Sequence, residues 1–214
     1  MKKEFIKRLL STILLIPLAL YFILKGSYFF TFFLLVCFLI SIYEWSRITK
    51  KNNFFPVGFI FLVLSFLAAN ILRVSNNDDY YTTFLVVIII CISTDIGGYI
   101  FGKLFKRPKL TKISPNKTYA GVIGSYLLSI INFFIFFKFS DLHNINNLTV
   151  EIIIFIILIS TVSQIGDLVI SYFKRKSNIK NTGNIIPGHG GLLDRIDGMI
   201  FAFPFAYCVT YFLK

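Results

Sequence analysis

Long apolar runs constrain the fold of this chain more than any other feature of its sequence. Several approach the roughly 20 residues that an α-helix, rising 1.5 Å per residue, needs to cross a bilayer. Charged residues make up only 15% of the chain, against about 25% in a typical soluble domain. The runs are continuous rather than alternating, which argues against a β-barrel. The expected fold class is therefore all-α, a polytopic integral membrane protein.

Hydropathy predicts about seven transmembrane helices. The basic, apolar N-terminus resembles a signal peptide, but it lacks a small-x-small cleavage site, so we expect a retained first span. The predicted spans are residues 9–24, 28–45, 54–72, 82–102, 119–138, 150–172 and 197–213.

Basic residues gather in alternate loops, which predicts the orientation of the chain. The N-terminal segment and the loops after the second, fourth and sixth spans are rich in Lys and Arg, and the intervening loops are poor in them. The positive-inside rule then places the N-terminus in the cytoplasm and the C-terminus outside. The net charge of +12 is mostly explained in this way. The loops 103–118 and 173–196 nevertheless carry more basic residues than topology requires.

Four acidic residues lie within or at the ends of predicted spans. They are Asp95, Asp167, Asp194 and Asp197, and all fall near the expected cytoplasmic end. An ionisable residue inside a span costs at least about 2.5–3.5 kcal/mol, so each is a candidate functional residue. The alternative for each is a buried salt bridge to a Lys or Arg. The other six acids, Glu44 among them, occupy loops or span ends that need no special explanation.

The surroundings of these acids indicate a phosphate site. Asp167, Ser171 and Lys174 are spaced i, i+4 and i+7 and share one helix face. Clustered carboxylates without His or Cys favour hard cations such as Mg²⁺. Basic side chains and the glycine-rich segment "PGHGG", with its unobstructed N–H groups, add the complement for phosphate. The pair Gly98 and Gly102, spaced G-x-x-x-G, is interpreted instead as helix packing.

The segment "SYFKRKSNIKNTGNIIPGHGGLLDRID", residues 171–197, resembles the signature of the phosphatidate cytidylyltransferases, or CDP-diacylglycerol synthases. The upstream segments "QIGDLVIS" and "TDIGGYIFGKLFK…KISPNKTYAGVIG" also resemble that family, so the likeness covers about residues 85–200. One position departs from the pattern: Asn181 stands where the family usually has Asp.

The resemblance implies that CTP and phosphatidate react to give CDP-diacylglycerol and pyrophosphate, for phospholipid biosynthesis. It implies Mg²⁺, one or two metal ions in all, a homodimer, no nucleic-acid partner, and a bacterial-type inner membrane with the active site facing the cytoplasm. We expect metal ligands at Asp167, Asp194, Asp197 and Asp95. Further catalytic residues are expected at Ser171, Lys174, Arg175, Lys180, His189 and Arg195, and substrate-binding residues at Lys112, Lys117, Gly190 and Gly191. Residues 1–80 would form an N-terminal three-span region and residues 81–214 the catalytic membrane region.

Three alternative functions remain open from the residues alone. A transporter or channel would place acids at several depths. A CTP-dependent enzyme acting on another lipid, such as an isoprenoid phosphate, would share the same polar residues. A lipid phosphatase would need a nucleophile or a set of histidines, and the chain has only His143 and His189.

Overall fold

The computed structural model describes residues 2–50, 53–75, 78–106, 108–111, 114, 117–139, 150–188 and 190–212, with the backbone alone at 2–9, 78 and 79. Within these residues the chain forms helices and no strands. The helices are α1 (Lys2–Lys25), α2 (Ser27–Thr49), α3 (Phe55–Val74), α4 (Asp78–Leu104), α5 (Tyr119–Phe139), α6 (Val150–Lys176), α7 (Leu193–Ile196) and α8 (Met199–Phe212).

Each predicted span corresponds to one of these helices, and the expected all-α membrane fold is confirmed. Five helices, α2 to α6, are long and apolar enough to cross a membrane, while Leu10–Lys25 and α8 are shorter apolar helices. Two boundaries differ from the approximate predicted ones by a few residues. Helix α6 continues to Lys176, so Lys174 and Arg175 extend a helix rather than begin a loop. The last apolar helix starts at Met199, after the separate turn α7.

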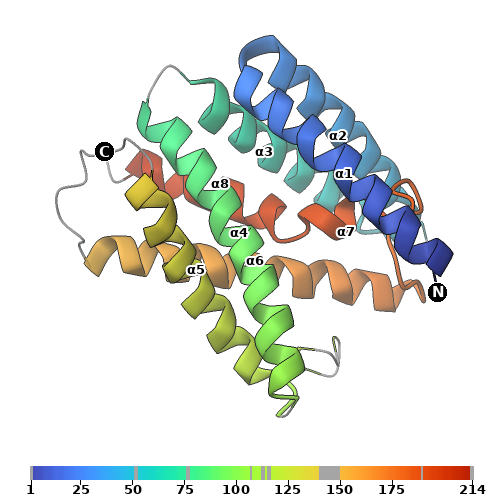
Figure 1. The fold of residues 1–214 in the computed structure, drawn as a ribbon. Helices are drawn as coiled ribbons and strands as arrows, with labels where there is room; N and C mark the ends of the chain where they lie inside the picture. The colour runs from blue at the N-terminus through green and yellow to red at the C-terminus, as the bar shows by residue number, and fades with distance from the viewer. Residues whose placement is uncertain are drawn as a thin grey trace.

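Helices α4 and α5 form a closely packed hairpin (Figure 1). Glycines allow this approach: a Cβ on Gly121 would lie only 3.0 Å from the carbonyl oxygen of Gly98 and 3.6 Å from the Cα of Gly102. The interpretation of Gly98 and Gly102 as packing residues is therefore confirmed. Small residues let membrane helices approach where the hydrophobic effect supplies no driving force between them.

Hydroxyl groups join α4, α5 and α6 below the apolar surface. The Thr94 hydroxyl lies 3.1 Å from that of Ser129 and 2.8 Å from that of Ser160, and Ser125 donates to the Thr94 carbonyl at 2.7 Å. In a membrane such bonds favour a defined helix arrangement. They fix the relative positions of α4 and α6, which both carry acids of the candidate site.

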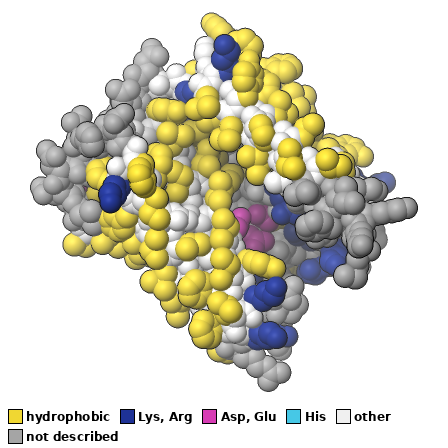
Figure 2. Space-filling view, viewed as in Figure 1, with side chains coloured by type: hydrophobic (Ala, Val, Ile, Leu, Met, Phe, Trp, Pro, Cys, Tyr) yellow, Lys and Arg dark blue, Asp and Glu magenta, His cyan; other side chains and the backbone are white. Residues whose placement is uncertain are grey.

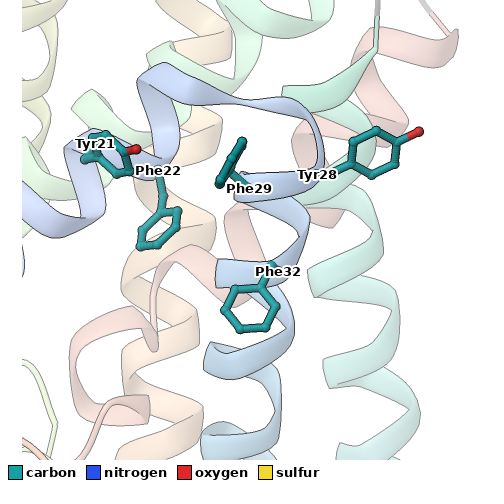
Figure 3. A pocket seen from close by; sticks show the side chains of 5 residues that line it. All are labelled: Tyr21, Phe22, Tyr28, Phe29 and Phe32. Carbon is teal, nitrogen blue, oxygen red and sulfur yellow. The ribbon is translucent and has the colours of Figure 1, made fainter.

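The two ends of the helix bundle differ in character. The start of α1 lies beside the C-terminal end of α6 and the loop that leads to α7, while the end of α8 lies on the opposite side of the molecule (Figure 1). At the far end, the α1–α2 turn carries an open aromatic hollow of about 490 Å³ lined by Tyr21, Phe22, Tyr28, Phe29 and Phe32 (Figure 3). Aromatic side chains of this kind are common where spans meet the membrane surface.

Candidate active site

One face of α6 presents the polar side chains that helical spacing predicts. The Ser171 hydroxyl donates to Oδ1 of Asp167 at 3.3 Å, one turn away. Ser171 and Lys174 are both buried, at 9% and 8% exposure. The expected common face of Asp167, Ser171 and Lys174 is thus present, at the end of α6 near the N-terminus of the chain.

Lys117 joins this face from the segment that precedes α5. Its Nζ lies 2.6 Å from Oδ2 of Asp167, and both side chains are about one quarter exposed. The same Nζ donates to the carbonyl of Gln164 at 3.2 Å. The expectation that Lys117 belongs to the site therefore has a geometric basis. Asp167 also forms a salt bridge to a lysine, which was the alternative explanation for each of the four acids.

Asp95, Asp167 and Asp197 approach one another from α4, α6 and the residue that follows α7. The side chains of Asp167 and Asp197 lie within hydrogen-bonding reach of each other, and Asp95 is close enough to both for electrostatic interaction. Asp197 is 8% exposed, and its Oδ1 also accepts the N–H of Gly198 at 2.9 Å. Figure 2 shows acidic side chains in a hollow between apolar walls, with Lys and Arg nearby.

Asp194 serves a different set of partners. Its Oδ1 lies 2.7 Å from Nζ of Lys174, and the two side chains are each 10% exposed. Its Oδ2 accepts the N–H groups of Thr182 at 2.8 Å and Gly191 at 3.2 Å. Both oxygens are therefore engaged in closing the loop onto α6. The expected role of Asp194 as a metal ligand stays a prediction, and the geometry favours a role in holding the loop.

The segment between α6 and α7, residues 177–192, is called the glycine loop. It folds back on itself between Ile186 and Gly190. These residues exchange two backbone hydrogen bonds, of 3.0 and 3.2 Å. Gly188 and Gly190 have φ values of +77° and +91°, which side chains rarely tolerate. The N–H groups of Gly190 and Gly191, expected to face phosphate, are both used inside the loop. A phosphate would have to displace one of these bonds.

Sequence reasoning missed Glu44, on α2. Its side chain is completely buried, at 0% exposure. It accepts hydrogen bonds from the Thr182 hydroxyl and from the N–H groups of Leu192 and Leu193. In the sequence, Glu44 stands beside Trp45 near the end of an apolar run. Acidic residues are ordinary at the end of a span, so this position did not indicate a buried carboxylate.

The remaining expected site residues lie around this centre. Arg175 and Lys180 are exposed. Arg195 is also exposed and close enough to Asp95 for electrostatic interaction. Asn181 is exposed, and its side chain lies beside Gly190. Lys112 and His189 fall outside the described residues, so their roles stay predictions.

The donor chemistry of the site fits Mg²⁺. Among the described residues, no three His, Cys, Asp or Glu side chains lie together as a ready-made metal cage. Mg²⁺, however, is commonly held by one or two carboxylates together with substrate phosphates. The facing carboxyls of Asp167 and Asp197 meet that requirement, and the ammonium of Lys117, 2.6 Å from Asp167, supplies only part of the positive charge that two neighbouring carboxylates call for.

Carboxylates, lysines and a closed glycine loop thus lie together at one end of a helical bundle whose long helices could cross a membrane. The chain belongs to the cytidylyltransferase family, whose sequence model matches residues 54–213. This range includes every expected site residue and excludes Glu44.

Relatives with assigned names support the same family. The chain is 32% identical to the phosphatidate cytidylyltransferase of Rickettsia typhi over 225 residues, covering 99% of this chain and 94% of the relative. It is 33% identical to the Rickettsia prowazekii enzyme of that name, with the same coverage of each chain. It is 35% identical to the Bacillus subtilis phosphatidate cytidylyltransferase over 73% of this chain and 60% of the relative. The resemblance drawn from residues 171–197 is thereby confirmed.

Proposed function

We propose that this membrane enzyme transfers the CMP moiety of CTP to phosphatidate, giving CDP-diacylglycerol and pyrophosphate. The relatives that cover almost the whole chain carry the name of this activity. The observation that carries the proposal in the structure is the cluster of interacting charges formed by Asp167, Asp197, Lys117 and Lys174 toward one end of α6. A lipid substrate requires an intramembrane site, and a nucleotide requires that the site open to water.

The basic side chains bind and orient the phosphates. Lys174, held by Asp194, and Lys117, held by Asp167, are placed to bind the triphosphate and the lipid headgroup, with Arg175, Lys180 and Arg195 around them. An oxygen of the phosphatidate phosphate attacks the α-phosphorus of CTP. The new P–O bond forms as the bond between the α-phosphorus and the α–β bridging oxygen breaks. The electron pair of the broken bond leaves with pyrophosphate. In such transfers positioning and charge neutralisation supply most of the catalysis.

The attacking group needs little help from a base. A phosphate monoester has a second pKa near about 6 and is mostly dianionic at pH 7. We therefore assign His189 to positioning phosphate rather than to proton abstraction.

Asp167 and Asp197 would hold Mg²⁺, with Asp95 within reach of a second cation. Bound Mg²⁺ would neutralise the nucleotide phosphates and the departing pyrophosphate. The hydroxyl of Ser171 orients Asp167 through its 3.3 Å hydrogen bond. Asp194 holds Lys174 and the loop in a fixed position relative to these acids.

We place this end of the bundle at the cytoplasmic face of a bacterial-type inner membrane. The last turns of α2, α4 and α6 carry Arg47, Lys103 and Lys174, in agreement with the positive-inside rule. A homodimer rests on the family resemblance alone. The proposed division at residue 80 stays a prediction, and Glu44 shows that the two regions contact each other within one site.

The test is a reconstituted assay with labelled CTP, Mg²⁺ and either phosphatidate or an isoprenoid phosphate. We expect a CDP-lipid from phosphatidate, with release of pyrophosphate. Product from the isoprenoid phosphate alone would assign the other lipid. No product from either lipid would contradict the proposal and favour the transporter alternative.

A further inference from the structure

The carboxylate of Glu44 is buried without a basic partner in the described part of the chain. It lies near the C-terminal end of α2 and is 0% exposed. The ion pairs found among the described residues join Lys117 to Asp167 and Lys174 to Asp194. A buried charge is costly unless other groups compensate it, so the hydrogen bonds of this carboxylate must have a strong structural effect.

All three donors to Glu44 come from the distant glycine loop and its junction with α7. Oε1 accepts the N–H of Leu192 at 3.0 Å, and Oε2 accepts the N–H of Leu193 at 2.8 Å. Oε2 also accepts the hydroxyl of Thr182 at 2.8 Å. These bonds to an ionised acceptor are stronger than neutral ones. They fasten both ends of the loop to one point on α2.

Two glycines of the loop are explained by the same carboxylate. A Cβ on Gly183 would lie 2.5 Å from Oε1 of Glu44, and its three nearest atoms would all belong to Glu44. A Cβ on Gly191 would lie 2.5 Å from Oε2 and would also collide with the Thr182 hydroxyl. A side chain at either place would therefore have to displace the carboxylate of Glu44 from its present position.

A continuous path of hydrogen bonds leads from Glu44 to the phosphate-binding side. Thr182 donates its hydroxyl to Glu44 and its N–H to Asp194. Asp194 in turn pairs with Lys174 at 2.7 Å. The N-terminal helices add further ties, from the Ser11 hydroxyl to the Pro187 carbonyl and from the Ser177 hydroxyl to the Ile48 carbonyl.

We propose that Glu44 is a positioning residue for the transfer reaction. It holds the glycine loop so that Asp194 presents Lys174 to the nucleotide phosphates. The inference rests on the proposed function, since Lys174 receives its phosphate role there. It also brings into the site a residue that lies outside the family-matched range of 54–213.

Glu44→Gln tests this role with almost no change of size. The amide has one acceptor oxygen, so its NH₂ group must face either Leu192 N–H or Leu193 N–H. We expect kcat to fall roughly 10- to 100-fold, as for other residues that orient a catalytic group. The KM for phosphatidate should stay within about twofold, since Glu44 is not assigned to the lipid. The matched control is Glu151→Gln in the first turn of α6, with wild-type kinetics expected.

A double variant separates positioning from general stability. Gly183→Ala should lower kcat because its Cβ collides with Glu44. Glu44→Asp withdraws the carboxylate by one methylene, so Glu44→Asp/Gly183→Ala should be at least as active as Glu44→Asp alone. Additive losses in the double variant would overturn the proposed contact.

Hydrogen exchange at the Thr182, Leu192 and Leu193 amides gives a readout independent of activity. Faster exchange together with lower kcat in Glu44→Gln supports the proposal. Wild-type kcat in Glu44→Gln, or lost kcat with unchanged exchange, overturns it. If the wild-type protein makes no CDP-diacylglycerol, the proposed function fails by itself, and faster exchange in the variant still supports Glu44 as the residue that positions the loop.

Discussion

Asp194→Asn should disable the enzyme by releasing the glycine loop and leave its Mg²⁺ affinity nearly unchanged. The wild-type carboxylate accepts Lys174 on one oxygen and the N–H groups of Thr182 and Gly191 on the other. Asn keeps only one acceptor. Whichever way the amide turns, its NH₂ group faces either the ammonium of Lys174 or two backbone N–H donors.

The magnitude follows from the burial of the pair. Lys174 and Asp194 are each 10% exposed, and breaking a buried ion pair typically costs about 3–5 kcal/mol. Part of the hydrogen bonding to the loop survives in one amide orientation, so we take the lower end, about 3 kcal/mol. Applied to the equilibrium between the closed and the released loop, at about 1.4 kcal/mol per factor of ten, this energy lowers the population of the closed loop relative to the released one roughly 100-fold, and kcat/KM for CTP should fall by up to that factor.

The assay is a Mg²⁺ titration of CDP-diacylglycerol formation at saturating phosphatidate. For Asp194→Asn the half-saturating Mg²⁺ concentration should stay within about twofold of wild type. For Asp167→Asn and Asp197→Asn it should rise at least about tenfold. Lys174→Met serves as the partner variant, and its loss should not add to that of Asp194→Asn. Rescue of Asp194→Asn by high Mg²⁺ would refute this reasoning and make Asp194 a metal ligand.

Three further outcomes follow from the structure. Lys117→Met removes the ion pair to Asp167 and should raise the KM for CTP or phosphatidate about tenfold; steady-state kinetics with each substrate varied will show whether either KM moves. Gly124→Val drives a side chain into Phe101 and should lower the free energy of unfolding by about 1–3 kcal/mol, measured by thermal melting in detergent against Ile123→Val on the lipid face. In a cysteine-free background, Lys180→Cys should react with an impermeant maleimide only after the membrane is opened, and labelling in intact cells would reverse the proposed orientation.

The spans and the polar face of α6 could be predicted from the sequence because both are local properties. Apolar length alone identifies a span, and helical spacing alone places Asp167 and Lys174 on one face. The C-terminal end of α6 was harder to predict, since a run of basic residues is compatible with the last turn of a helix or with a loop. The structure shows that the helix simply continues to Lys176.

The distribution of partners could not be predicted from local spacing. Asp194 and Asp197 are three residues apart, yet one carboxylate closes the loop and the other faces Asp167. From the sequence, the glycine N–H groups were expected to be free for phosphate. In the folded loop the N–H of Gly190 donates to Ile186 and that of Gly191 donates to Asp194. Glu44 was invisible for the same reason, because its hydrogen-bond donors lie 138 to 149 residues downstream.

That separation has a consequence for how the protein is made. Chains emerge from the ribosome at about 5–20 residues per second. The 138 residues between Glu44 and Thr182 therefore represent roughly 7–30 s of synthesis. During this interval α2 must enter the membrane while its carboxylate still lacks the amides that will solvate it. Water and lipid headgroups at the membrane surface would have to solvate Glu44 until translation delivers Thr182, Leu192 and Leu193.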